Sequence, residues 1–290
     1  MHNLMRGLSM KQSTKRKMRV TISTLILIVV SIVVLLPFIW MISTSLQPDL
    51  KSVYQIPPQW IPAPPTWSNY LTAWQSAPFG IYLRNSIIVA VTATLLQLIN
   101  ASMSAYVFSW MEFPGRDIIF VFFLAVLMIP GQVTLVPNYI VISNLDWIDT
   151  LKALIIPVSV SAFGTFLIRQ AFMSVPKDLI DAAVVDGASH LKILFKILIP
   201  LNMPMMLTFA LLSFNWRWNN YFWVLVMTNS TNKRTLPVGL VQMRMGPEQG
   251  TQWQIIMAAT VLVILPVMLL FGFFQRYFVE GVTRSGLKGV

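Results

Sequence analysis

Cysteine is absent from the 290-residue sequence, and histidine occurs only at His2 and His190. The absence of cysteine excludes structural disulfides, thiolate metal sites and a cysteine nucleophile. So few histidines also argue against a zinc cluster or a Ser-His-Asp constellation, and we interpret His190 as a solvated loop residue. The sequence contains no G-x-x-x-x-G-K-[ST] phosphate loop either. It is therefore predicted to be non-catalytic and to bind no cofactor of its own.

Charged residues are also scarce. They make up 11% of the sequence, against 56% hydrophobic residues, whereas a soluble domain has roughly 25% charged residues. A water-soluble globule could not bury so much apolar surface, so the composition indicates an integral membrane protein. The net charge of +11 does not indicate a nucleic-acid partner, because Lys and Arg flank apolar segments instead of gathering on one polar face.

Six apolar runs have about the 17 to 25 residues that a helix needs to cross a bilayer. They lie at about 20–45, 85–109, 118–136, 150–172, 202–226 and 253–274. The first is longer than a signal-peptide core and contains Pro37 and Trp40, so we expect it to remain uncleaved. The Pro- and Trp-rich segment 47–79 is expected to be an ordered external loop. The sequence thus predicts an all-α, polytopic protein.

The predicted organisation consists of a tail, a membrane domain and a second tail. Their bounds are 1–19, 20–275 and 276–290, and the last is expected to be flexible. Lys and Arg are concentrated on the side of the two tails, which predicts that both termini are cytoplasmic. The residues on that side are Arg6, Lys11, Lys15, Arg16, Lys17, Arg19, Arg116, Lys177, Lys192, Lys196, Arg276, Arg284 and Lys288. Those on the other side are Lys51, Arg84, Lys152, Lys233, Arg234 and Arg244.

Polar residues in the second span allow two interpretations. Either they serve helix packing, as small and hydroxyl residues do in membrane helices, or they line a pathway. These residues are Thr92, Thr94, Gln97, Asn100, Ser102 and Ser104. Prolines 130, 157, 204 and 266 interrupt spans, which is tolerated only where the freed backbone is buried in protein or faces water.

The cytoplasmic segment 174–200 is predicted to form a helix-turn-helix. Pro176 suits the first turn of a helix, with Ser174 near the cap position, and Gly187 suits the left-handed residue that ends it. Ser189 can cap a second helix whose apolar residues recur at i, i+3, i+4 and i+7. These are Leu191, Leu194, Phe195 and Leu198. The element suits docking of another protein, and the alternative is an amphipathic hairpin at the interface.

The same segment resembles the coupling loop of binding-protein-dependent ABC importer permeases, in which E-A-A is followed by three residues, G, nine residues and I-x-L-P. The matching residues are Ala182, Ala183, Gly187, Ile197 and Pro200. Asp181 replaces the family glutamate, which puts any contact of that glutamate in doubt, and Ile199 replaces leucine. The coupling residues are then Asp181, Ala182, Ala183, Asp186, Gly187, Phe195, Ile197 and Pro200. Asp186 is expected either to cap the second helix or to pair with a basic group of an ATPase subunit.

Nearly the whole chain is similar to the smaller permease of the maltose-type, carbohydrate-importing group. The motifs that carry this resemblance are TSLQP, RNS, FPGR and FNWRWNNYFW. The resemblance implies a type I importer permease of the bacterial inner membrane that pairs with a second, homologous permease. It also implies two ATP-binding subunits that bind ATP and Mg, an extracytoplasmic solute-binding protein, and a sugar or related solute, with an oligosaccharide favoured.

The motif FNWRWNNYFW combines amides with aromatic rings, a combination that binds sugars. We take these residues as pathway or gate candidates, and the alternative is an aromatic belt at the membrane boundary. They are Asn215, Trp216, Trp218, Asn219, Asn220 and Tyr221. The external segment 227–252 resembles the family loop that reaches the binding protein, which makes Gln242, Gln249 and Gln252 contact candidates.

Three other classes of protein are less compatible with the sequence. A passive channel would not need a docking element on the cytoplasmic side. A secondary transporter would need carboxylates within its spans, yet all ten lie in loops or at span ends. A membrane-embedded enzyme would need titratable groups that converge at one depth.

The predicted topology is tested by labelling single cysteines introduced into this cysteine-free chain. An impermeant thiol reagent on intact cells should label Ser230→Cys and leave Ser189→Cys unlabelled until the membrane is permeabilised. The reverse pattern would show that the orientation is wrong.

Overall fold

The computed structural model describes residues 2–244 and 252–286, and the side chains of 18–243 and 252–275. All regular elements in these residues are helices. They belong to two compact units, one formed by residues 1–73 and 249–261 and the other by residues 74–248 and 262–290. The all-α prediction is confirmed for the described part of the chain.

The first unit contains the long helix α1 (His2–Ser45) and a folded loop that carries α2 (Leu50–Val53) and the start of α3 (Ser68–Gln75). Asn69 Nδ2 donates to the carbonyl oxygens of Ser45 and Gln47, at 2.9 and 2.8 Å. The rings of Trp40 and Trp60 meet edge to face, with 5.0 Å between centroids. These contacts fold the loop onto the end of α1, and the prediction of an ordered Pro- and Trp-rich loop is confirmed.

Three described helices are long and apolar enough to cross a membrane, at 18–45, 79–110 and 253–275. A fourth candidate is the pair His190–Leu201 and Met203–Trp218, which is bent by 84°. Three or four such helices are fewer than the six runs predicted from the sequence. The last helix, α15 (Trp253–Gly286), also continues beyond the predicted end of its span at 274, so the tail expected to be flexible is helical up to Gly286.

The other two apolar runs are broken where prolines occur. Pro130 lies between the short helices α5 (Arg116–Ala125) and η1 (Val126–Met128) and the helix α6 (Leu135–Asn144). Pro157 lies between α7 (Leu151–Ile155) and α8 (Ala162–Phe172). Proline has no backbone N–H and clashes with the preceding turn, which accounts for helix ends at these positions.

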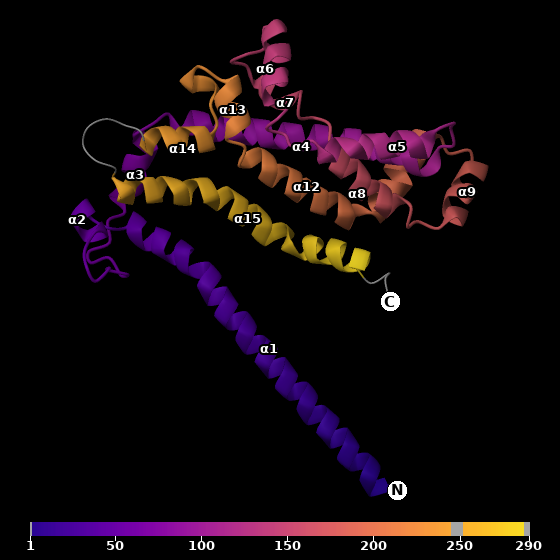
Figure 1. The fold of residues 1–290 in the computed structure, drawn as a ribbon, viewed down its shortest axis with the longest axis horizontal. Coiled ribbons are helices and arrows are strands. Elements are labelled where there is room, and N and C mark those ends of the chain that lie inside the picture. The colour runs from indigo at the N-terminus through magenta and orange to yellow at the C-terminus, as the bar shows by residue number, and fades with distance from the viewer. Residues whose placement is uncertain (1, 245–251, 287–290) are drawn as a thin grey trace. The chain divides into compact units, whose positions relative to one another are not determined.

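The second unit is organised around α4 (Phe79–Trp110), which lies beside α8 and α12 (Met203–Trp218) (Figure 1). Between α8 and α12 the chain forms α9 (Lys177–Val185), α10 (His190–Ile193), the π-helix η2 (Leu194–Leu198) and α11 (Ile199–Leu201). After α12 come α13 (Phe222–Met227), the 3-10 helix η3 (Thr231–Lys233) and α14 (Leu236–Arg244).

Two apolar cores lie along α4. Near its C-terminal end, Ala101, Ala105 and Tyr106 pack with buried residues of α8, α9, α10, η2 and α12. Near its N-terminal end, Val89 packs with buried residues of α6, α7, α13 and α14. Since α9 to η2 lie at one end and α14 at the other, α4 contacts both groups of connecting segments.

A buried polar network lies on α4 between the two cores. Gln97 accepts a hydrogen bond from the Ser213 hydroxyl at 2.6 Å and donates to the carbonyl of Val158. Asn100 donates to the carbonyl of Ser159 at 3.0 Å. These two amides satisfy backbone oxygens that the break at Pro157 leaves without a helical partner. For Gln97 and Asn100 the packing interpretation of the polar second span therefore accounts for their contacts.

The close approach of α8 and α12 depends on Gly164. A Cβ at this position would overlap the ring of Phe209, which is completely buried in α12. The ring therefore occupies the space that a larger residue of α8 would need.

We predict that Gly164→Ala lowers the free energy of unfolding of the solubilised permease by about 1–3 kcal/mol, the usual cost of overpacking a core. Gly272→Ala is the matched control, because Gly272 is also helical but a Cβ there meets nothing within 4 Å. Thermal or denaturant unfolding of both variants measures the difference. Equal stability of the two would contradict the tight α8–α12 contact.

Candidate functional site

The turn between α9 and α10 has the hydrogen bonds of a Schellman motif. Gly187 N donates to Val184 O at 3.0 Å and Ala188 N donates to Ala183 O at 2.9 Å. Gly187 has φ +74°, in the left-handed region that favours glycine. Ala183 and Ala188 are both partly buried against the core, as the motif requires. The predicted conformation of Gly187 is confirmed.

The second helix begins with the predicted cap but continues differently. Ser189 Oγ accepts a hydrogen bond from Lys192 N at 3.4 Å, so Ser189 and not Asp186 caps this helix. Ser174 Oγ donates to Ala171 O at 2.8 Å and thus belongs to the end of α8, which corrects its predicted place at the start of α9.

The π-helix η2 changes which side chains of this segment are buried. Ile193, Leu194 and Leu198 are buried, whereas Leu191 and Phe195 are 60% and 48% exposed. The predicted apolar face was therefore wrong at these two positions, because a π-turn shifts the register of a regular helix. Phe195 is left on the outside together with Pro200, while Ile197 is half-buried.

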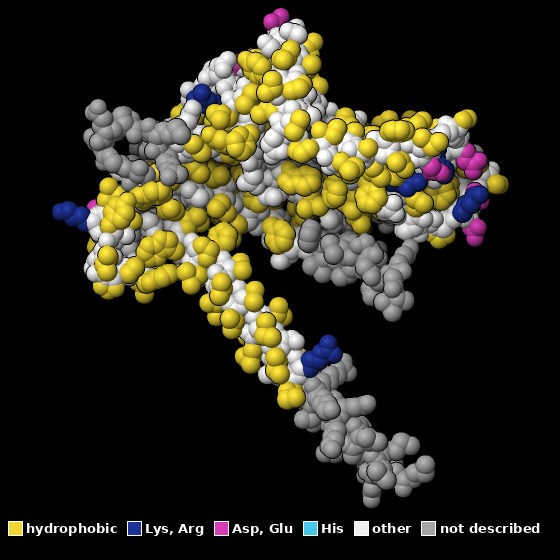
Figure 2. Space-filling model, in the orientation of Figure 1, with side chains coloured by type: hydrophobic (Ala, Val, Ile, Leu, Met, Phe, Trp, Pro, Cys, Tyr) yellow, Lys and Arg dark blue, Asp and Glu magenta, His cyan; other side chains and the backbone are white. Residues whose placement is uncertain are grey.

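The outer face of α9 is acidic and apolar. Of its residues only Ile180 is buried, and Val185 is 87% exposed. Acidic side chains gather over α9, with basic side chains beside them (Figure 2). The exposed residues here include Asp178, Asp181, Ala182, Val184 and Asp186. An exposed surface of this kind, held in a defined turn, is suited to contact with another protein.

Two contacts tie the segment and its neighbour α8 to α4. The Tyr106 hydroxyl and His190 Nδ1 lie 2.7 Å apart in a hydrogen bond. His190 is exposed, as predicted, but it is also fixed by this bond. Arg169, at the end of α8, donates from Nε to Phe108 O at 3.0 Å and lies over the Phe120 ring, 4.2 Å from its centroid. The helix-turn-helix is therefore anchored on α4 and α5.

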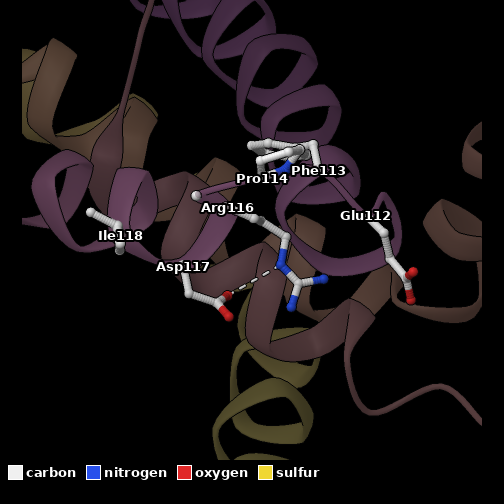
Figure 3. A pocket seen from close by; sticks show the side chains of 7 residues that line it. Glu112, Phe113, Pro114, Arg116, Asp117 and Ile118 are labelled. Atoms are coloured by element: carbon white, nitrogen blue, oxygen red, sulfur yellow. Dashed lines mark hydrogen bonds and ion pairs between the residues drawn. The ribbon is translucent and has the colours of Figure 1, made fainter.

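The FPGR motif forms the turn from α4 to α5 and lines a pocket of about 640 Å³, formed by residues 112–118 (Figure 3). Gly115 has φ +78°, and Arg116 Nε lies 3.1 Å from Asp117 Oδ1. Arg169 Nη2 lies 3.8 Å from the same carboxylate oxygen. The Asp117 carboxylate, directly after the motif, thus links the start of α5 to the end of α8.

The structure separates the pathway candidates into buried and open residues. Trp218 is 1% exposed, and its Nε1 donates to Val263 O at 3.2 Å. Asn220 Oδ1 accepts from Trp223 N at 3.3 Å and so orders the start of α13. Asn215, Trp216 and Asn219 are exposed. Trp218 and Asn220 therefore have structural roles, and fewer residues of the motif are exposed than the six predicted as pathway candidates.

The remaining residues of the motif contact one another or a neighbouring helix. Asn219 Nδ2 donates to Asn215 Oδ1 at 2.9 Å, and the Trp216 ring lies 5.7 Å from that of Phe163. Tyr221, which is half-buried, meets Phe222 edge to face at 5.3 Å.

The segment before α14, which the sequence predicts to be external, is held by side chains of α4 and by Asp149, which lies two residues before α7. Asn85, which is completely buried, donates from Nδ2 to the carbonyls of Asn232 and Arg234, both at 2.9 Å. Ser86 Oγ accepts from Leu236 N at 2.9 Å. Asp149 Oδ1 accepts from the backbone N–H groups of Asn229 and Ser230, each at 2.9 Å. We refer to these contacts of Asn85, Ser86 and Asp149 as the external clasp.

The electrostatics of the clasp favour an ionised Asp149. Burial disfavours the charge, but the hydrogen bonds from Ser230 and Asn229, together with the attraction of Lys233, lower the pKa of this carboxyl below its ordinary value. Gln242 lies half-buried on α14 beyond the clasp and Gln252 is exposed, while Gln249 lies outside the described residues. Within the described part of the chain, no group of three His, Asp or Glu side chains could hold a metal ion.

Comparison with known proteins identifies the family of the chain. Residues 97–284 match the model of the family described as binding-protein-dependent transport system inner membrane component. The chain belongs to this family. It is thus a multi-pass permease of the inner membrane and the non-catalytic component of a binding-protein-dependent ABC importer.

Individual relatives cover most of the permease. The sn-glycerol-3-phosphate transport system permease protein UgpE of Pectobacterium atrosepticum is 33% identical over 91% of this chain and 95% of its own length. The arabinooligosaccharides transport system permease protein AraQ of Halalkalibacterium halodurans is 35% identical over 79% of this chain and 81% of its own length. Both are named as permease proteins of transport systems, in agreement with the permease resemblance seen in the sequence.

A solved structure has the same fold as the permease. It is a crystal structure of a bacterial ABC transporter involved in the import of the acidic polysaccharide alginate. One of its chains matches with a TM-score of 0.80 and 25% identity, over 89% of this chain and 95% of that chain. The helices that break at Pro130 and Pro157 thus belong to a known permease architecture.

Several residues that position the site were not singled out from the sequence. The tripeptide RNS was noticed only as a family motif, although its Asn85 and Ser86 make the clasp. The bond from Tyr106 to His190 and the clasp residue Asp149 were missed as well. The sequence offers one signal for these contacts, an asparagine near the end of an apolar run. This signal could not be interpreted, because the partners of these residues lie up to 150 positions away in the sequence.

Trp218 and Trp216 form a matched pair that tests the assignment of buried and open residues. Trp218→Ala should lower the free energy of unfolding of the permease by about 3–5 kcal/mol, because it removes a buried indole. Trp216→Ala should lower it by only about 0.5–1.5 kcal/mol, from the loss of its contact with Phe163. Unfolding of the two purified variants measures this difference. Similar losses for both would mean that Trp216 is also part of the packed interior.

Proposed function

We propose that this permease forms half of the translocation pathway of an ATP-driven importer, and that the segment 174–200 transmits the movement of separate ATPase subunits. The observation that supports the proposal most strongly is the turn at Gly187. It is a Schellman motif that fixes the end of α9 in a defined conformation. Its outer face presents the motif residues Asp181, Ala182 and Asp186 to the surroundings.

The exposed face of α9 suits a partner whose surface is both apolar and basic. It combines three carboxylates with the apolar side chains of Leu179, Val184 and Val185. Such a surface can be buried in a cleft with an apolar floor and a basic rim. We assign this cleft to the ATP-binding subunits, which bind ATP and Mg, since the permease sequence has no phosphate loop. We also assign Phe195, Ile197 and Pro200, which follow in η2 and α11, to the coupling segment.

A sugar or a related solute is the proposed cargo, and an oligosaccharide is favoured. The relatives are named for sn-glycerol-3-phosphate and for arabinooligosaccharides, and the solved transporter for alginate. The cargo would be delivered by an extracytoplasmic binding protein, with Gln242, Gln249 and Gln252 as contact candidates. Asn215, Trp216 and Asn219, which are open in this chain, would face the pathway beside the second permease.

The proposed topology has six crossings and both termini in the cytoplasm. Three crossings are the long apolar helices, and the bent pair His190–Leu201 and Met203–Trp218 contributes a fourth. The runs 118–136 and 150–172 contribute the other two as pairs of shorter helices. Broken crossings of this kind require that other protein segments satisfy the backbone, as Gln97 and Asn100 do for the break at Pro157.

A passive channel or a secondary transporter subunit is the alternative. Neither needs a cytoplasmic docking element with a defined turn. Ion-coupled transport would also need carboxylates inside the spans, whereas all ten carboxylates of the sequence lie in loops or at the ends of the proposed spans. We therefore prefer ATP-driven import.

The proposal predicts that Gly187→Ala uncouples ATP hydrolysis from solute uptake. A Cβ at Gly187 meets nothing within 4 Å, so the strain arises from its positive φ and not from crowding. A side chain in this conformation costs about 1–2 kcal/mol, which is enough to shift a docking equilibrium about tenfold. Uptake in proteoliposomes should fall accordingly, while the six crossings remain folded.

Three further variants make this test specific to the backbone. Gly187→Asn should retain most uptake, because asparagine tolerates the left-handed conformation. Gly187→Val should be at least as defective as Gly187→Ala. Gly131→Ala is the matched control, since its Cβ also meets open space and no positive φ occurs there. Normal uptake and normal attachment of the ATPase subunits in both Gly187→Ala and Gly187→Val would refute the coupling role.

A further inference from the structure

The external clasp fixes α14 to α4 by more than hydrogen bonds. A Cβ on Gly239 of α14 would overlap the ring of Tyr82 of α4, so the helix lies directly on this ring. Leu236 and Val238 of α14 are completely buried. With Asn85 and Ser86 holding the preceding segment, α14 has little freedom to move without α4.

The other end of α4 is fixed to the coupling segment in the same way. The Tyr106 hydroxyl bonds His190 directly after the Gly187 turn, and Ala105 and Tyr106 belong to the core that contains Ile180, the buried residue of α9. The Phe108 carbonyl is bonded by Arg169 at the end of α8. The segment 174–200 is thus anchored on the last two turns of α4.

Between these two ends α4 is one helix of 32 residues without an internal proline. Ser86 and Tyr106 are twenty residues apart, which corresponds to roughly 30 Å along a helix. The buried bonds of Gln97 and Asn100 hold its middle against neighbouring segments. The sequence motifs for coupling and for external contact lie on other elements, yet both sets of elements are attached to α4.

We propose that α4 is the element that transmits movement between the coupling segment and the external segment, with Tyr106 and Ser86 as positioning residues at its ends. The inference rests on the proposed coupling function of segment 174–200. Movement of α9 by the ATPase subunits would be passed through His190 and Tyr106 to α4. It would then reach α14 and Gln242 through the clasp, so that ATP binding inside alters the surface offered outside.

The test uses the reporter substitution Gln242→Cys, at a residue that is half-buried on α14. The purified importer complex is treated with a maleimide, with and without Mg-ATP, and the labelling rate is compared. In the parent we expect Mg-ATP to change this rate roughly fivefold or more, the lower range of typical coupling between sites. Basal ATP hydrolysis is measured in parallel.

Two variants remove single contacts at the ends of α4. Tyr106→Phe removes only the hydroxyl that meets His190, and Ser86→Ala removes only the acceptor of Leu236 N. Each should lose at least half of the Mg-ATP response while basal ATP hydrolysis stays unchanged. Ser109→Ala is the matched control, because the Ser109 hydroxyl bonds only within α4, to Ala105 O and Tyr106 O, and it should keep the full response.

The combination of the two variants distinguishes one transmitting element from two independent ones. Changes at distant sites normally act independently, so their effects multiply. If both act through α4, the combined variant should be no worse than the more defective single variant. A full response in both single variants, or a multiplied loss in the combined one, would overturn the inference. If the parent complex does not hydrolyse ATP at all, the proposed function fails and this inference with it.

Discussion

Every break in a membrane-embedded helix leaves backbone groups that water cannot reach, and this constraint shapes the whole permease. The freed groups must be satisfied by other protein segments. At the break between α7 and α8, the carbonyls of Val158 and Ser159 are taken by Gln97 and Asn100 of α4. The amides therefore make a broken crossing possible, and α4 becomes the helix on which the others depend.

This dependence explains why two separate groups of short helices are both attached to α4. An unbroken α4 can support short helices that would not be stable by themselves, since isolated helices of this length are marginal. The apolar cores at its two ends hold α9 to η2 on one side and α13 and α14 on the other. A rigid central helix with short segments at both ends is suited to relay movement, because packed cores shift between discrete arrangements and do not deform continuously.

The sequence alone predicted the elements that depend on local chemistry. The membrane class follows from apolar runs, and the turn at Gly187 follows from glycine's freedom at positive φ, followed by a serine cap. The family could be recognised because the coupling loop is a local motif with fixed spacing. Prolines 130 and 157 were noted as interruptions, and the helices do end there, whereas the same prediction was wrong for Pro266, which lies inside α15.

What the sequence did not predict depends on distant partners. The burial of Trp218 requires Val263 O, and the role of Asn85 requires the carbonyls of Asn232 and Arg234. The π-helix that exposes Phe195 also has no local signature in the sequence, because it reflects how the segment fits against the core. Interactions between residues a hundred or more positions apart cannot be inferred from periodicity.

We propose that this permease couples ATP hydrolysis on separate subunits to solute import. The most direct measurement is accumulation of radiolabelled oligosaccharides in proteoliposomes that contain the purified complex, with internal ATP and a loaded binding protein added outside. We expect uptake against a gradient, and this uptake should require both ATP and the binding protein. Uptake that proceeds without ATP and stops at equal concentrations would contradict it and indicate a channel.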